Sequence, residues 1–118
     1  MERIVQLLKA LSDETRLKIL VILSRRRICA KGLSKHLGIS EAAVSQHLRA
    51  LKDAEIIVGE KIGYYVHYVI QEFRLMEVIS LIEELCDHKS SMKCFPEVHL
   101  TSDCRENCKS SRNMCCRK

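Results

Sequence analysis

Cysteine is the residue type whose spacing points most directly to chemistry in this sequence. Five of the seven cysteines lie within the last 25 residues: Cys94, Cys104, Cys108, Cys115 and Cys116. Thiolates favour soft or borderline ions such as As(III), Sb(III), Cd(II), Cu(I) or Zn(II) over Mg(II) and Ca(II). These cysteines are therefore candidate ligands of a metal or metalloid centre. The alternative is a tail whose thiols have no defined role.

The other two cysteines, Cys29 and Cys86, allow a second kind of thiol chemistry. They, or the C-terminal cysteines, could form a reversible disulfide in a redox sensor. The sequence has neither a signal-peptide pattern nor a long uncharged apolar run, so we expect a cytoplasmic protein without a membrane span. Thiols stay reduced in that compartment, which favours metal or redox chemistry over structural disulfides.

A second chemical signal lies between residues 29 and 57, where two short helical patterns, KGLSKHL and EAAVSQHLRALKDA, flank Gly38-Ile39-Ser40. Gly38 can adopt the left-handed conformation that ends one helix, and Ser40 can cap the next. In the second pattern Val44, Leu48 and Leu51 form one apolar stripe that faces a core. This arrangement predicts a helix-turn-helix motif.

The other side of that second helix carries the candidate DNA contacts. In helix-turn-helix proteins the second helix lies in the major groove, and small or hydrogen-bonding residues in its first half approach base edges. We expect these contacts from Glu41, Ala42, Ser45, Gln46 and Arg49. An ordinary amphipathic helix with a solvated polar face is the alternative.

Strand-forming residues dominate from Ile56 to Ile70, with Gly63 midway where a hairpin would turn. We predict a two-stranded wing. Lys61, near its tip, is placed to meet a DNA phosphate, although it could equally be an exposed lysine that protects a strand edge.

Three further helices are predicted around this unit. The first covers residues 2–11, and the second runs from Asp13 through Arg26 with Leu17, Ile19, Leu20, Ile22 and Leu23 buried. Arg25, Arg26 and Arg27 then either contact phosphate or are simply solvated. The last helix, from Glu72 to His88, carries an apolar stripe longer than a small domain needs, so we expect it to form a homodimer interface with the first helix.

The 118 residues and their charge fit one domain with an appendage. We divide the chain into a DNA-binding and dimerisation domain over 1–88 and a cysteine-rich, flexible tail over 89–118. The net charge of +5 includes +4 over residues 13–68 and −4 over residues 69–88. The basic excess thus coincides with the predicted DNA-binding unit. No phosphate loop, Ser-His-Asp set or redox Cys-x-x-Cys is visible, so we do not expect an enzyme.

The order of elements and the strings LSDETRLKIL, VSQHLRALKDAEII and GYYVHYVI resemble the ArsR/SmtB family of winged-helix metalloregulatory repressors. The resemblance covers residues 4–86. It implies a mainly α fold with a small β-hairpin, and a homodimer that binds double-stranded operator DNA and is released by a metal, metalloid or other chemical signal.

The sensor sites of the family match this sequence poorly. One class has a CxCxxC-like string where this chain reads CAKGLS (29–34), which leaves only Cys29. Another class has an Asp-x-His pair where this chain has Glu72-Phe73-Arg74, and a distal pair where it has Leu85 and His88. Some members sense through C-terminal cysteines, as the tail here suggests.

These observations lead to one hypothesis and two rivals. We expect a repressor released from its operator by a soft metal or metalloid, As(III), Sb(III), Cd(II) or Zn(II), bound by the tail thiolates. The nearest rival is a thiol-redox or persulfide sensor of the same fold. The other is a metal-sequestering thiol protein.

Overall fold

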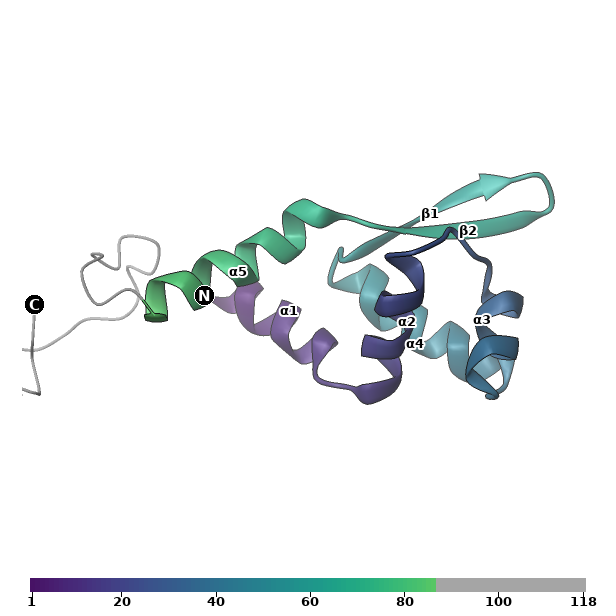
Figure 1. Cartoon of the computed structure of the whole chain (residues 1–118), viewed down its shortest axis with the longest axis horizontal. Coiled ribbons are helices and arrows are strands. Elements are labelled where there is room, and N and C mark those ends of the chain that lie inside the picture. Colours follow the sequence, from purple (N-terminus) through teal and green to yellow (C-terminus); the bar gives the residue numbers. More distant parts are fainter. Residues whose placement is uncertain (87–118) are drawn as a thin grey trace, which may run out of the picture. The chain divides into compact units, whose positions relative to one another are not determined.

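The computed structural model describes residues 1–86. The elements follow one another as α1 (Glu2–Leu11), α2 (Glu14–Leu23), α3 (Ala30–Leu37), α4 (Glu41–Asp53), β1 (Ile57–Ile62), β2 (Tyr65–Ile70) and α5 (Glu72–Cys86). Figure 1 shows this order, which is the predicted winged helix-turn-helix. The chain divides into two units, residues 2–79 and residues 80–118 with Met1, so the division falls within α5. The boundary predicted between residues 88 and 89 lies outside the described residues.

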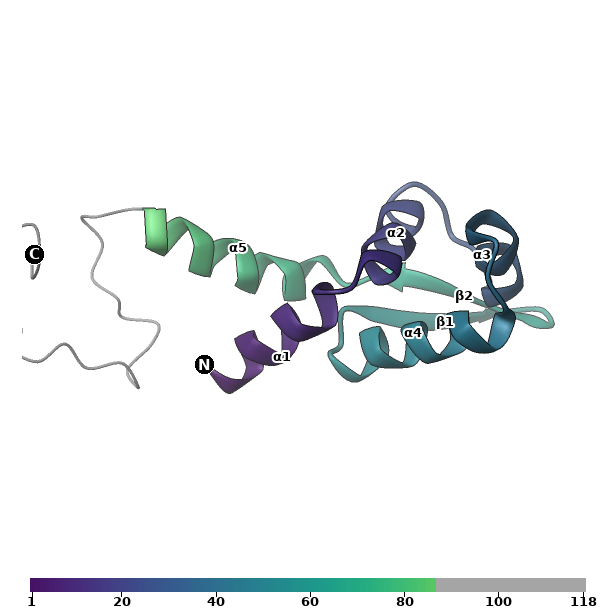
Figure 2. The same ribbon diagram turned by 90° about the horizontal axis from the view of Figure 1, so that it is seen from below.

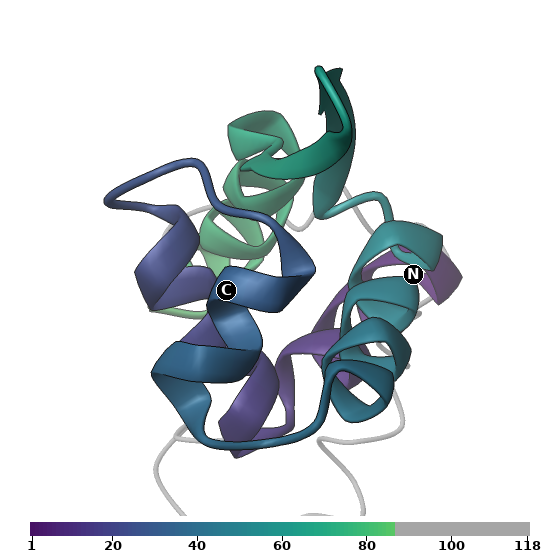
Figure 3. The same cartoon turned by 90° about the vertical axis from the view of Figure 1, so that its right-hand side faces the viewer.

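The helix ends follow from local hydrogen bonding. Asp13 caps α2 by accepting a hydrogen bond from the Arg16 N–H at 3.0 Å, and Ser40 caps α4 by accepting one from the Ala43 N–H at 3.1 Å. Gly38 ends α3 with a φ of 66°, in the left-handed region where a side chain would be strained. These caps confirm the predicted helix-turn-helix, and Figure 3 shows the short turn that joins its two helices.

The core is entirely apolar among the described residues. It includes the predicted stripe of α4, with Val44 and Leu51 fully buried and Leu48 2% exposed. The other buried side chains come from every other helix, from the segment between α2 and α3, and from β1 and its approach: Leu7, Ala10, Ile19, Leu20, Leu23, Ile28, Leu33, Ala54, Ile56, Ile57 and Val78. One shared core therefore holds the two helix-turn-helix segments against α1, α2 and the start of α5.

Two predictions about α2 were wrong. Leu17 is 48% exposed rather than buried, because Ile19, Leu20 and Leu23 occupy the core-facing side and Leu17 and Val21 lie on the opposite side. The helix also ends at Leu23 instead of continuing through Arg26. Ser24 donates its hydroxyl to the Val21 carbonyl at 2.7 Å, a local bond of the kind that competes with helix continuation.

The predicted wing is an antiparallel hairpin in which Ile57 pairs with Ile70 and Ile62 with Tyr65. Its turn consists of Gly63, with a φ of 63°, and Tyr64. Ile28 adds an isolated bridge to Tyr68, which fastens the segment between α2 and α3 to the hairpin. Figures 1 and 2 both place the hairpin tip at the same end of this unit as the beginning of α4.

Candidate nucleic-acid interface

The outward side of α4 carries the residues predicted to contact DNA. Glu41, Ala42, Ser45, Gln46 and Arg49 are all exposed, and they lie opposite the buried stripe of the same helix. Their exposure agrees with the prediction. Their contact with DNA stays a prediction.

Two of the predicted cations are available to phosphate. Arg49 on α4 and Lys61 on β1 are exposed, and neither takes part in an ion pair with another residue of the part that the structure describes. A lysine or arginine without an acidic partner loses nothing within the protein when it binds a phosphate. Both side chains can therefore supply the sequence-independent part of DNA binding.

A shallow groove of about 240 Å³ lies between the wing and the starts of α3 and α4. Cys29, Ala30, Lys31 and Glu41 line one side, and Tyr64, Tyr65, Val66 and Tyr68 line the other. Tyr64, which is 100% exposed at the hairpin tip, was not among the residues predicted to contact DNA. Its signal was the position directly after Gly63, since a two-residue turn presents its second residue to solvent.

The basic run 25–27 is split between two roles. The Arg27 guanidinium donates to the Glu60 carboxylate at 2.8 Å and so ties the end of this run to β1. Arg25 and Arg26 are exposed and make no ion pair within residues 1–86. Arg27 thus helps to hold the wing, and the two arginines before it remain open to solvent or phosphate.

Asp13 connects α2 to the recognition helix α4. Its carboxylate lies 3.7 Å from Nδ1 of His47, which is half-buried beside the core stripe. The hydrogen bond from the Arg16 backbone lowers the pKa of Asp13, and the nearby charge of His47 acts in the same direction. His47 therefore packs between α4 and the start of α2.

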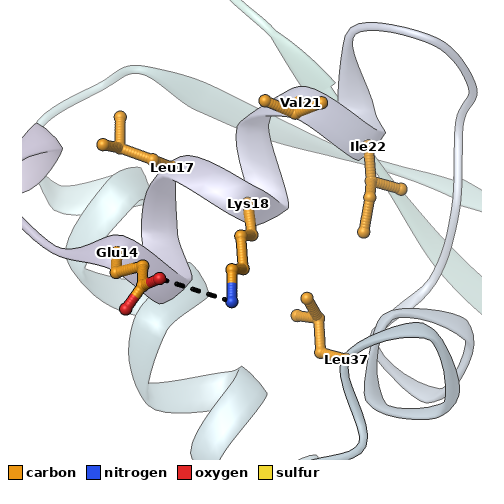
Figure 4. Close-up of a pocket in the computed structure, with 6 residues that line it drawn as sticks. All are labelled: Glu14, Leu17, Lys18, Val21, Ile22 and Leu37. Carbon is orange, nitrogen blue, oxygen red and sulfur yellow. Dashed lines mark ion pairs between the residues drawn. The ribbon is translucent and has the colours of Figure 1, made fainter.

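An apolar groove of about 380 Å³ lies on the outer side of α2 (Figure 4). Leu17 and Val21 form its exposed wall, and Ile22 and Leu37 line it as well. Glu14 and Lys18 make an ion pair of 3.6 Å at its edge. The groove contains no residue predicted to bind DNA or metal.

The candidate thiol sites are only partly within the described residues. Cys29 is the N-cap of α3, half-buried, and makes no capping hydrogen bond with its side chain; Cys86 ends α5 and is exposed. Both are free thiols. The candidate ligands Cys94, Cys104, Cys108, Cys115 and Cys116 lie outside the described residues.

Two searches of residues 1–86 bear on other site types. No group of three or more His, Cys, Asp or Glu side chains in this part could hold a metal ion. None of its helices has the length and apolarity needed to cross a membrane.

Comparison with known proteins decides the family. Residues 13–58 match the family described as "Bacterial regulatory protein, arsR family". Over 98 residues the chain is 31% identical to the arsenical resistance operon repressor of Staphylococcus aureus, and the alignment covers 83% of this chain and 92% of the relative. The chain belongs to the ArsR family.

Further members of the ArsR family share the sequence or the fold. The transcriptional repressor SdpR of Bacillus subtilis is 36% identical over 72 residues, which are 61% of this chain and 80% of SdpR. An ArsR-like transcriptional regulator from Rhodococcus superposes with a TM-score of 0.67 at 29% identity, covering 72% of this chain and 80% of that one. The family resemblance and the winged helix-turn-helix fold predicted from the sequence are confirmed.

One neighbour of the same fold is described as a homodimeric winged helix-turn-helix DNA-binding domain from Mycobacterium bovis. It has a TM-score of 0.61 at 20% identity and covers 85% of this chain and 88% of that one. As a member of the ArsR family, this chain is a DNA-binding transcriptional repressor. The contact of α4 and the wing with DNA stays a prediction.

Proposed function

We propose that this repressor binds its operator as a homodimer and leaves it when a soft metal or metalloid, As(III) foremost, is bound by thiolates of residues 94–118. This proposal rests on one observation: the chain has a DNA-binding domain of the ArsR family and, in its last 25 residues, five cysteines. The S. aureus relative is an arsenical resistance operon repressor.

DNA recognition is assigned to the first half of α4 and to the wing. Ala42 and Ser45 are small enough to let the helix approach base edges, and Gln46 and Arg49 can form paired hydrogen bonds with them. Arg49 can instead bind phosphate, as can Lys61 on the wing. Glu41, in the first turn of α4, can accept a hydrogen bond from a cytosine amino group.

The dimer is assigned to the apolar faces of α5 and α1. Val78 of α5 is buried and Leu75 packs against the core, but Phe73, Met76 and Ile79 are 57%, 54% and 43% exposed. The exposed row continues along the helix with Ile82 and Leu85. Exposed apolar rows of this length mark protein–protein contacts, and a self-complementary one suits a symmetric dimer.

A thiolate site is favoured over the zinc-type site of the family. Arg74 stands where that class has a ligand, and its guanidinium pairs with the carboxylates of Glu55 and Glu77. A cation in this position would repel a metal ion. Thiolates further along the chain remain as the soft-ion ligands, and As(III), Sb(III), Cd(II) or Zn(II) suit them.

The test is a titration of the full-length protein with arsenite in the presence of reductant. Thiolate-to-metalloid absorbance reports binding, and fluorescence anisotropy of a labelled operator duplex reports release. We expect replacement of Cys104, Cys108, Cys115 and Cys116 by Ser to abolish both signals, because a hydroxyl replaces a thiolate ligand poorly. DNA affinity without arsenite should be unchanged.

The matched control replaces Cys29 and Cys86 by Ser, and this variant should respond like the wild type. If the four-serine variant still left DNA on arsenite addition, Cys29, Cys86 or Cys94 would be the sensor. If an oxidant released the wild type and arsenite did not, the thiol-redox alternative would replace this proposal.

A further inference from the structure

The recognition helix ends in a turn that would suit glycine but contains Glu55. The Glu55 N–H donates to the Lys52 carbonyl at 2.9 Å, and the Ile56 N–H donates to the Leu51 carbonyl at 3.0 Å. This pair of bonds is the Schellman motif, whose left-handed residue is usually Gly. Glu55 has a φ of 60° and is the only non-glycine residue with positive φ among the described residues. A residue held in this conformation suggests that its side chain has a role.

The Glu55 carboxylate is bound by arginines from two other helices. It accepts a hydrogen bond from Arg74 of α5, whose side chain is only 13% exposed, and lies 3.6 Å from the Arg3 guanidinium of α1. Glu77 closes the cluster, with one oxygen 3.5 Å from Arg3 and the other 3.4 Å from Arg74. The Arg74 guanidinium also lies over the Phe73 ring, 4.8 Å from its centre. Arg74 is largely shielded from water, whereas the side chains of Arg3 and Glu55 are 55% and 58% exposed. The pairs that Arg74 makes are therefore stronger than the exposed pair between Arg3 and Glu55.

The backbone on both sides of Glu55 is held by the same neighbours. Gln6 of α1 donates to the Asp53 carbonyl at 3.4 Å, and the Gln71 N–H, just before α5, donates to the Ile56 carbonyl at 2.7 Å. The end of α4 is thus connected to α1 and to the start of α5 by backbone and side chain alike.

We propose that Glu55 is a positioning residue for DNA binding, which fixes the angle of the recognition helix relative to α1 and α5 without touching DNA. Thirteen helical residues place the start of α4 about 20 Å from Glu55. A tilt of about 10° at the Glu55 end would therefore move the DNA-reading end by about 3 Å. Since α1 and α5 are also the helices assigned to the dimer, this inference rests on the proposed homodimer. Glu55 then sets the spacing between the two recognition helices.

The test uses Glu55→Gly and Glu55→Gln in the full chain. Glycine adopts the positive φ without strain, so the first variant keeps the turn and removes the side chain together with its carboxylate. The second keeps the size of the side chain and removes the charge. Glu14→Gln, which breaks the exposed ion pair with Lys18 within α2, is the matched control. Operators are recovered by selection from random duplexes with the wild-type protein, and copies are made with the half-sites moved by one base pair.

We expect both Glu55 variants to remain folded dimers and to bind the operator about tenfold more weakly. The ratio of the affinities for the operator and for the copies with altered half-site spacing should fall as well. If Glu55 only stabilised the end of α4, this ratio would not change. The salt dependence of binding should stay as in the wild type, because no phosphate contact is lost. Glu14→Gln should keep the affinity and the spacing preference of the wild type.

Unchanged affinity and spacing preference in both dimeric Glu55 variants would overturn the positioning role. So would tighter binding with a changed salt slope, which would mean that Glu55 lies beside a phosphate. A monomeric wild-type protein would refute the homodimer itself and with it the spacing role, and this result is visible before any variant is made.

Discussion

The recognition helix α4 and the last helix α5 are both amphipathic, yet they leave different side chains outside. In α4, Val44, Leu48 and Leu51 are buried, and the outer side is polar. In α5, only Val78 is buried, and the outer side carries Phe73, Met76, Ile79, Ile82 and Leu85. A polar outer side suits base edges and phosphates, whereas an apolar one suits another protein surface. The difference agrees with the proposed partners, which are DNA for α4 and a second copy of the chain for α5.

The largest effect is expected from the inner side of α4. Leu51→Ala should lower the free energy of unfolding by about 2–5 kcal/mol, because the side chain is fully buried and its loss leaves a cavity. Leu17→Ala, the same change at a residue that is 48% exposed, should cost less than about 1 kcal/mol. Urea denaturation of both variants measures the contrast. Equal losses would mean that Leu17 is covered in solution.

The outer side of α5 is tested by Ile79→Asp. A charge within the proposed interface should produce monomers, and operator affinity should fall about 10²-fold or more because the two half-sites are no longer bound together. Analytical ultracentrifugation and anisotropy measure the two effects. Ile62→Asp on the wing, where the isoleucine is 48% exposed against 43% for Ile79, should remain dimeric. A dimeric Ile79→Asp variant would remove α5 from the interface.

Substitutions on the outer side of α4 should weaken operator binding without changing the stability of the fold. Gln46→Ala or Arg49→Ala should weaken operator binding by about 1–3 kcal/mol if the residue reads a base edge. Thermal unfolding should stay close to the wild type, since both side chains are exposed. If neither change alters affinity or base preference, recognition must be assigned to other residues, with exposed Tyr64 of the wing as the next candidate.

The smallest effect concerns the link between α2 and α4 at Asp13. Its pKa is lowered below the ordinary 3.8 in the folded protein, so its stabilising contribution is present above pH 3.8. That contribution is lost as the pH falls through the lowered pKa. Asp13→Ala should therefore destabilise the protein at neutral pH and approach the wild type in strong acid, as followed by denaturation at several pH values.

Ser40→Ala is the control for Asp13→Ala. It removes the side-chain N-cap of α4 without removing a titratable group. Its cost of about 1 kcal/mol should not follow the same acid dependence. A parallel pH profile for the two variants would contradict the lowered pKa of Asp13, because its capping hydrogen bond is the main cause of that shift.

The local sequence pattern was sufficient to predict the helix-turn-helix motif and the wing. The apolar period of α4, the left-handed glycine at 38, the cap at Ser40 and the turn at Gly63 were all readable from the sequence, because each depends on neighbouring residues. The exposure of Gln46 and Arg49 followed from the same period. The family resemblance rested on the same segments.

The exposed side of α2 and the ion pairs of Glu55 depend on contacts between residues distant in sequence. The sequence of α2 is apolar on nearly every side, so its period could not show that Leu17 faces outward, and only the packing of Ile19, Leu20 and Leu23 did so. Nothing in the order of residues links Glu55 to Arg3 and Arg74, because an ion pair carries no local periodicity. The sequence by itself determined which side chains share a helix face. The tertiary structure decided which faces are covered and which charges meet, since both depend on how the helices pack.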